Sequence, residues 1–101
     1  MRIYFWLILF FASVFASSTH AQEKTQRIIA LAPHIVENLY AIGAGDDVVA
    51  TVDHADYPEA ANNIMRIGGH QGVQLEKVLA LQPTLVVVWQ GGNKAADIEA
   101  L

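Results

Sequence analysis

Three short apolar runs constrain the fold of this chain more than any other feature. They are RIIAL at 27–31, VVATV at 48–52 and TLVVVW at 84–89. Their apolar residues follow one another without alternation, as is typical of strands buried on both faces of a parallel sheet. Apolar residues at helical spacing lie between the runs: Ile35, Val36, Leu39 and Ile42, then Leu75, Val78 and Leu79. The alternation predicts an α/β fold, with a three-layer, Rossmann-like parallel sheet over residues 27–101.

Proline and glycine mark the expected ends of the helices. Pro33 suits the first turn of a helix that Gly43 and Gly45 end, and Pro83 ends the next helix. We expect a turn-rich loop at 53–58, a single helical turn at 59–63, and a short strand leading into a loop at 64–72. Asn93 is expected to cap a last helix that begins at Lys94.

The N-terminus predicts export. Arg2 precedes a 14-residue apolar stretch, Ile3–Ala16, and Thr19-His20-Ala21 resembles a cleavage site, so residues 1–21 read as a secretory signal peptide. A membrane anchor is the alternative, but the apolar stretch is shorter than the roughly 20 residues that a span needs. Residues 22–26 are expected to form a free polar tail. Leu101 lies inside a helical pattern, which suggests a fragment of a longer protein or an early-terminated product without function.

Charge and cysteine usage narrow the function classes. Loss of residues 1–21 would leave 80 residues and, without Arg2, change the net charge from −4 to −5. An acidic surface argues against nucleic acid or anionic membrane as a partner. The chain has no Cys, so it relies on packing and lacks a residue for lipid anchoring. A free, monomeric protein of a Gram-negative periplasm fits these features best.

The candidate site follows from the sheet. Ligands bind beyond the carboxyl ends of parallel strands, so the residues that leave each strand are the candidates. These residues combine imidazoles, a phenol, an indole, amides and glycines, a surface suited to a large planar ligand. We predict the ligand-binding residues to be Pro33, His34, His54, Tyr57, His70, Gln71, Trp89, Gly91 and Gly92.

Other chemistries have weaker support. His34, His54 and His70 could bind zinc, but no two of them have a local ligand spacing, so no metal site is predicted. Asp53 and Asp56 could serve a metal-dependent hydrolase, yet no nucleophile with a base accompanies them, and loop solvation is the simpler interpretation. The glycine pairs form no nucleotide-binding motif. We therefore expect no catalytic residues and no enzyme activity.

Residues 27–101 resemble the N-terminal lobe of periplasmic cobalamin-binding proteins, the substrate-binding subunits of the ABC importer for vitamin B12. The motifs that carry the resemblance are RIIALAP with Glu37, DYP, QGVQLEKVLALQP and LVVVWQGGN. The resemblance implies two α/β lobes joined by a long helical hinge, with cobalamin or a related corrinoid held between them and no cofactor. It also implies that Trp89 and the 69–71 loop face the ligand, and that Glu76 docks onto the inner-membrane permease.

Two departures keep a second ligand class open. The chain has Ala32 where the family often has Ser, and His54 and His70 where aromatic residues are common. Imidazole can stack on a planar ligand and can also approach a metal centre. Haem or a ferric siderophore is therefore the alternative ligand.

Overall fold

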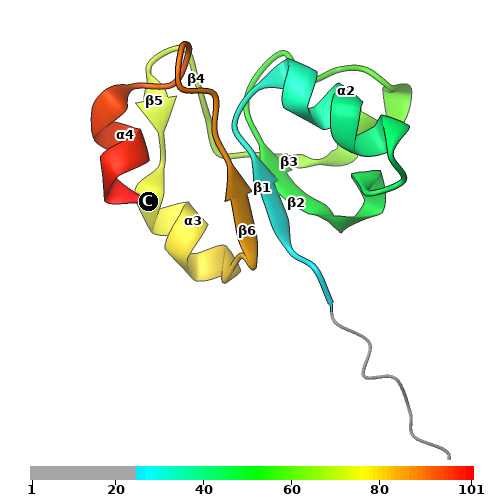
Figure 1. Ribbon diagram of the computed structural model, residues 1–101, viewed down its shortest axis with the longest axis horizontal. Helices are drawn as coiled ribbons and strands as arrows, with labels where there is room; N and C mark the ends of the chain where they lie inside the picture. The colour runs from blue at the N-terminus through cyan, green and yellow to red at the C-terminus, as the bar shows by residue number, and fades with distance from the viewer. Residues whose placement is uncertain (1–24) are drawn as a thin grey trace, which may run out of the picture.

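The computed structural model describes residues 25–101 and contains a four-stranded parallel sheet (Figure 1). The strand order is β3-β2-β1-β6, and each neighbouring pair is parallel. The strands are β1 (Ile28–Ala30), β2 (Val48–Thr51), β3 (Met65–Arg66) and β6 (Leu85–Val87). The predicted α/β parallel sheet is therefore confirmed.

The remaining elements connect these strands. Helix α2 (Pro33–Ala41) follows β1, α3 (Leu75–Leu81) precedes β6, and α4 (Ala95–Ala100) follows it. Two short 3₁₀ helices, η2 (Gly45–Asp47) and η3 (Glu59–Asn63), flank β2. A small antiparallel hairpin, β4 (Gly68–Gly69) and β5 (Gly72–Val73), replaces the loop expected after the short strand.

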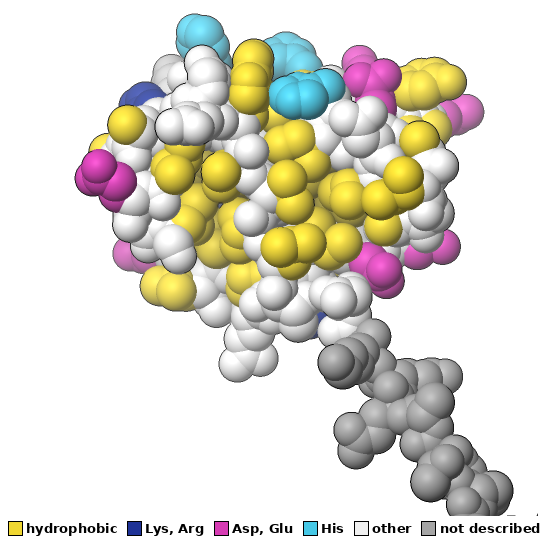
Figure 2. Space-filling view, in the orientation of Figure 1, with side chains coloured by type: hydrophobic (Ala, Val, Ile, Leu, Met, Phe, Trp, Pro, Cys, Tyr) yellow, Lys and Arg dark blue, Asp and Glu magenta, His cyan; other side chains and the backbone are white. Residues whose placement is uncertain are grey.

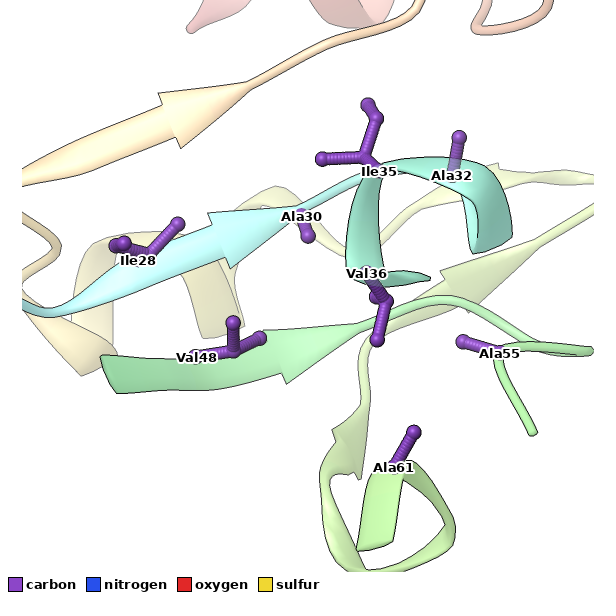
Figure 3. Close-up of a cluster of buried hydrophobic side chains, with 8 residues drawn as sticks. All are labelled: Ile28, Ala30, Ala32, Ile35, Val36, Val48, Ala55 and Ala61. Atoms are coloured by element: carbon purple, nitrogen blue, oxygen red, sulfur yellow. The ribbon is translucent and has the colours of Figure 1, made fainter. Parts of the chain in front are cut away.

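Successive strand residues point to opposite sides of the sheet, so each strand presents apolar side chains on both faces. A helix covers each face. On one side Ile28, Ala30 and Val48 pack against Ile35 and Val36 of α2 (Figure 3). On the other side Ile29, Leu31 and Ala50 pack with Val78 of α3. The three-layer arrangement follows from these two clusters.

Helix α2 begins and ends as its proline and glycine predict. Pro33 occupies the first turn, where its missing N–H costs no hydrogen bond. Gly43, two residues after the helix, has a φ of +86°, which glycine adopts without strain. Ile42 was expected on the apolar face but is 77% exposed, because it lies beyond the last helical residue.

One expectation about burial is wrong. Leu79 is 77% exposed, since α3 meets the sheet through Val78 and Leu81 instead. Among the strands of residues 25–101, β6 pairs with β1.

The predicted signal peptide, residues 1–21, lies outside the described residues. Of the predicted tail only residues 25 and 26 are described. Gln26 is not free there, since its side-chain Oε1 accepts a hydrogen bond from the Thr84 hydroxyl at 2.6 Å. Across residues 25–101, no helix is both long enough and apolar enough to cross a membrane.

Candidate functional site

The strand order creates a crevice between the carboxyl ends of β1 and β6. From β1 the chain crosses to β2 through α2 on one face, whereas β6 is reached from β3 through α3 on the other face. The connections therefore diverge between these two neighbouring strands, which is the point where open α/β sheets bind ligands. Figure 2 shows histidine side chains along this end of the molecule, the upper edge of the view.

A hollow of about 340 Å³ opens at this point. The segments that leave β1, β2 and β6 all contribute to it, together with the hairpin. Its lining residues are Leu31, Ala32, Pro33, Val52, Asp53, His54, Gly69, His70, Trp89, Gly92 and Asn93. The residues at the strand ends make part of the wall apolar. The imidazoles of His54 and His70, the Asp53 carboxylate and the Asn93 amide make the rest polar.

Trp89 forms one side of the hollow and remains 48% exposed. Its ring meets the His34 ring edge to face, with centroids 5.0 Å apart and planes at 85°. The six-membered part of the indole lies over Gly92, where an added Cβ would be 2.0 Å from the Trp89 Cε3. Gly92 is thus a glycine because the indole occupies the space that a side chain would need.

Asn93 holds the backbone around this tryptophan. Its Oδ1 accepts a hydrogen bond from the Trp89 backbone N–H at 2.6 Å, and its Nδ2 donates to the Leu31 carbonyl at 2.8 Å. The prediction that Asn93 caps the last helix is wrong, because Lys94 is the N-cap of α4 and no side chain caps that end.

His54 and His70 face the hollow from two different loops. His54 has a φ of +71°, a left-handed conformation that non-glycine residues adopt rarely and that is often found at functional sites. His70 lies at the hairpin tip, which is fixed to α4 at two points. The Lys94 Nζ donates to the Gln71 carbonyl at 2.6 Å, and the Val73 N–H donates to the Asp97 carboxylate at 3.1 Å.

The structure gathers most of the residues predicted from the sequence. Pro33, His54, His70, Trp89 and Gly92 line the hollow. His34 contacts the Trp89 ring, and Gly91 lies beside the indole nitrogen, to which an added Cβ would be 3.3 Å away.

Gln71 and Tyr57 lie elsewhere. Gln71 lines a neighbouring polar hollow of about 630 Å³, which also includes Asp53 and Arg66. Tyr57 is 67% exposed and lines neither hollow.

Asp53 and Asn93 line the hollow but were not among the predicted site residues. Asp53 follows β2, so the strand-end rule could have included it, and its carboxylate lies against Gly69. No group of three or more His, Cys, Asp or Glu side chains within residues 25–101 is placed to hold a metal ion.

Comparison with known proteins gives the family. Residues 28–101 match the family described as periplasmic binding protein. The chain belongs to this family. Among its relatives, the vitamin B12-binding protein of Vibrio parahaemolyticus serotype O3:K6 is 42% identical over 100 residues, which cover 99% of this chain and 35% of the relative. The chain thus spans about a third of the length of the curated relatives it matches.

Solved structures of periplasmic binding proteins have the same fold. The periplasmic vitamin B12-binding protein BtuF of Vibrio cholerae superposes with a TM-score of 0.72 at 41% identity, over 74% of this chain and 29% of the other. The periplasmic haem-binding protein RhuT of Roseiflexus superposes with a TM-score of 0.69 at 29% identity, over 76% of this chain and 30% of the other. These relatives are named as binding proteins and not as enzymes.

Proposed function

We propose that this chain is the N-terminal ligand-binding lobe of a periplasmic substrate-binding protein that delivers cobalamin or a related corrinoid to an ABC importer. The observation that carries the proposal is the hollow at the β1–β6 crevice, with the half-exposed Trp89 beside it. Identity of 42% to vitamin B12-binding relatives supports this ligand class.

The hollow has the chemistry that a corrinoid requires. A corrin ring is broad and nearly flat and carries amide side chains at its rim. The indole of Trp89 and the imidazoles of His54 and His70 offer ring faces and edges to a planar ligand. The Asp53 carboxylate can accept hydrogen bonds from peripheral amides. Pro33 and Gly92 line this wall, and His34 and Gly91 flank the indole. Gln71 lines the neighbouring hollow and Tyr57 lies on an exposed loop, so neither belongs to this wall.

In the whole protein we expect two lobes. Residues 27–101 form the first, and a helical hinge would join it to a second lobe that closes over the ligand. The predicted signal peptide directs the protein to the periplasm, where it acts as a monomer. Residues 25–101 supply only one wall, so this chain alone should bind weakly, with a Kd on the order of 0.1–1 mM, or about −4 to −5.5 kcal/mol.

Haem is the second candidate ligand. The RhuT structure, from a haem-binding protein, shares 29% of the aligned residues, and His54 and His70 both line the hollow. An imidazole can ligate haem iron. A corrinoid ligand remains the first proposal because identity to the vitamin B12-binding relatives is higher.

Separate binding measurements with the two ligands distinguish the proposals. We would measure binding of cyanocobalamin to the 101-residue chain by equilibrium dialysis, and binding of hemin at matched concentrations by the position of its Soret band. The corrinoid proposal predicts saturable binding of cyanocobalamin and no shift of the hemin Soret band. A Soret shift that His70→Ala abolishes, with no retention of cyanocobalamin, would establish the haem alternative instead.

Glu76 is proposed to dock onto the permease. It is exposed in the first turn of α3 and lines none of the ligand hollow, and its position near a helix N-terminus favours a carboxylate. In the protein with both lobes, we expect Glu76→Lys to slow ligand-dependent transport by the reconstituted importer at least about tenfold. Ligand affinity should stay unchanged, and a loss of affinity would contradict the docking role.

A further inference from the structure

Asn93 makes a pair of hydrogen bonds that joins two strand ends far apart in sequence. Its Oδ1 accepts from the Trp89 backbone N–H at 2.6 Å, four residues away. Its Nδ2 donates to the Leu31 carbonyl at 2.8 Å, across 62 residues of sequence. One side chain thus connects the end of β6 to the end of β1 across the crevice.

Two further backbone hydrogen bonds close the turn around the tryptophan. The Trp89 carbonyl accepts hydrogen bonds from the N–H groups of Gly92 and Asn93, at 3.0 and 2.8 Å. With Asn93 Oδ1 on the Trp89 N–H, both backbone polar groups of Trp89 have partners within its own turn. Since the turn is bound to Leu31, the Cα–Cβ direction of Trp89 is fixed relative to β1.

This arrangement differs from a helix cap. A capping Asn would accept hydrogen bonds from N–H groups of the following helix. Here the N-cap of α4 is Lys94, and Asn93 Oδ1 bonds backward to Trp89. The amide of Asn93 is therefore committed to the segment before it and to the neighbouring strand.

We propose that Asn93 is a positioning residue that holds Trp89 at the ligand hollow. It acts through the backbone of Trp89 and keeps the indole over Gly92 and against His34. The proposal rests on the proposed binding role of this hollow for its functional meaning. The geometry itself can be tested without ligand, so failure of one proposal is distinguishable from failure of the other.

The test uses the full chain with Trp6→Phe, which leaves Trp89 as the only tryptophan. Asn93→Leu removes both hydrogen bonds at nearly constant volume, and Asn93→Asp keeps an acceptor for the Trp89 N–H. Asn62→Leu is the matched control, because Asn62 donates to the Glu59 carbonyl in η3 and does not line the hollow. Acrylamide quenching of Trp89 and hydrogen exchange of its backbone amide are measured in each chain.

We expect Asn93→Leu to raise quenching by up to about twofold, since Trp89 is already 48% exposed, and to expose its amide to rapid exchange. Asn62→Leu should leave both readouts close to those of the parent. Asn93→Asp should keep the protection of the Trp89 amide and raise quenching, because a carboxylate accepts from the Trp89 N–H but cannot donate to the Leu31 carbonyl. Unchanged readouts in Asn93→Leu would overturn the positioning role, and loss of Trp89 amide protection in Asn93→Asp would overturn the assignment of that protection to the Oδ1 acceptor. If Asn93→Leu does not unfold cooperatively, protection of the Trp89 amide in Asn93→Asp decides: retained protection supports the proposal, and lost protection overturns it.

Discussion

Replacement of Gly92 by alanine should move the indole of Trp89 while leaving the fold intact. The added Cβ would lie 2.0, 2.3 and 2.5 Å from Cε3, Cζ3 and Cδ2 of the ring. Ordinary contact begins near 3.4 Å, so the ring must move by more than 1 Å. The indole can make this movement, because it is the outer part of a half-exposed side chain.

The expected change in stability is small because two effects oppose each other. Displacing the ring weakens its edge-to-face contact with His34, worth about 0.5–1.5 kcal/mol. Gly92 does not have a positive φ, so alanine fits the backbone and restricts the unfolded chain, a gain of about 0.4–1 kcal/mol. The net change should stay within about 1 kcal/mol, or less than about 8 °C in Tm.

Gly91→Ala is the matched control. Its Cβ would lie 3.3 Å from the Trp89 Nε1 and at least 3.9 Å from the other ring atoms, so a shift of a few tenths of an ångström accommodates it. In the Trp6→Phe chain, the indole N–H resonance and the near-ultraviolet circular dichroism report on Trp89 alone. Gly92→Ala should change both signals strongly, whereas Gly91→Ala should change the circular dichroism little and the indole N–H resonance only slightly. Parent-like signals in a folded Gly92→Ala chain would refute the placement of the ring.

Three further substitutions test other parts of the structure. Thr51→Val removes the buried hydrogen bond from its hydroxyl to the Ala30 carbonyl and should cost about 1–3 kcal/mol, measured by urea unfolding; a change below about 0.5 kcal/mol would contradict this role. Gln82→Gly should raise Tm by a few °C, roughly 1 kcal/mol, because Gln82 has a φ of +49° at the end of α3; a lower Tm would refute the strain argument. Asp97→Ala should speed exchange of the Val73 amide at least about tenfold by removing its acceptor, whereas unchanged exchange would mean that the hairpin is not held by α4.

The strands and the first helix could be predicted because local rules determine them. Continuous apolar runs located β1, β2 and β6, and Pro33 and Gly43 marked the limits of α2. The strand-end rule also selected Pro33, His54, His70, Trp89 and Gly92, which lie together at one hollow in the structure.

The errors arose where a distant partner decides the outcome. Helical spacing grouped Leu79 with Val78, but the spacing does not say which turn of α3 the sheet covers. An Asn directly before a helix usually caps that helix. At Asn93 the side chain instead forms a hydrogen bond to the Leu31 carbonyl, 62 residues away in the sequence.

The most direct test of the account is a titration of the Trp6→Phe chain with cyanocobalamin, followed by the indole N–H resonance of Trp89. We predict a saturable shift of this resonance with a Kd on the order of 0.1–1 mM. The shift should weaken in Gly92→Ala, in which the indole is displaced at the hollow. A Trp89 resonance that stays unmoved up to several millimolar cyanocobalamin would contradict the assignment of this crevice as the corrinoid site.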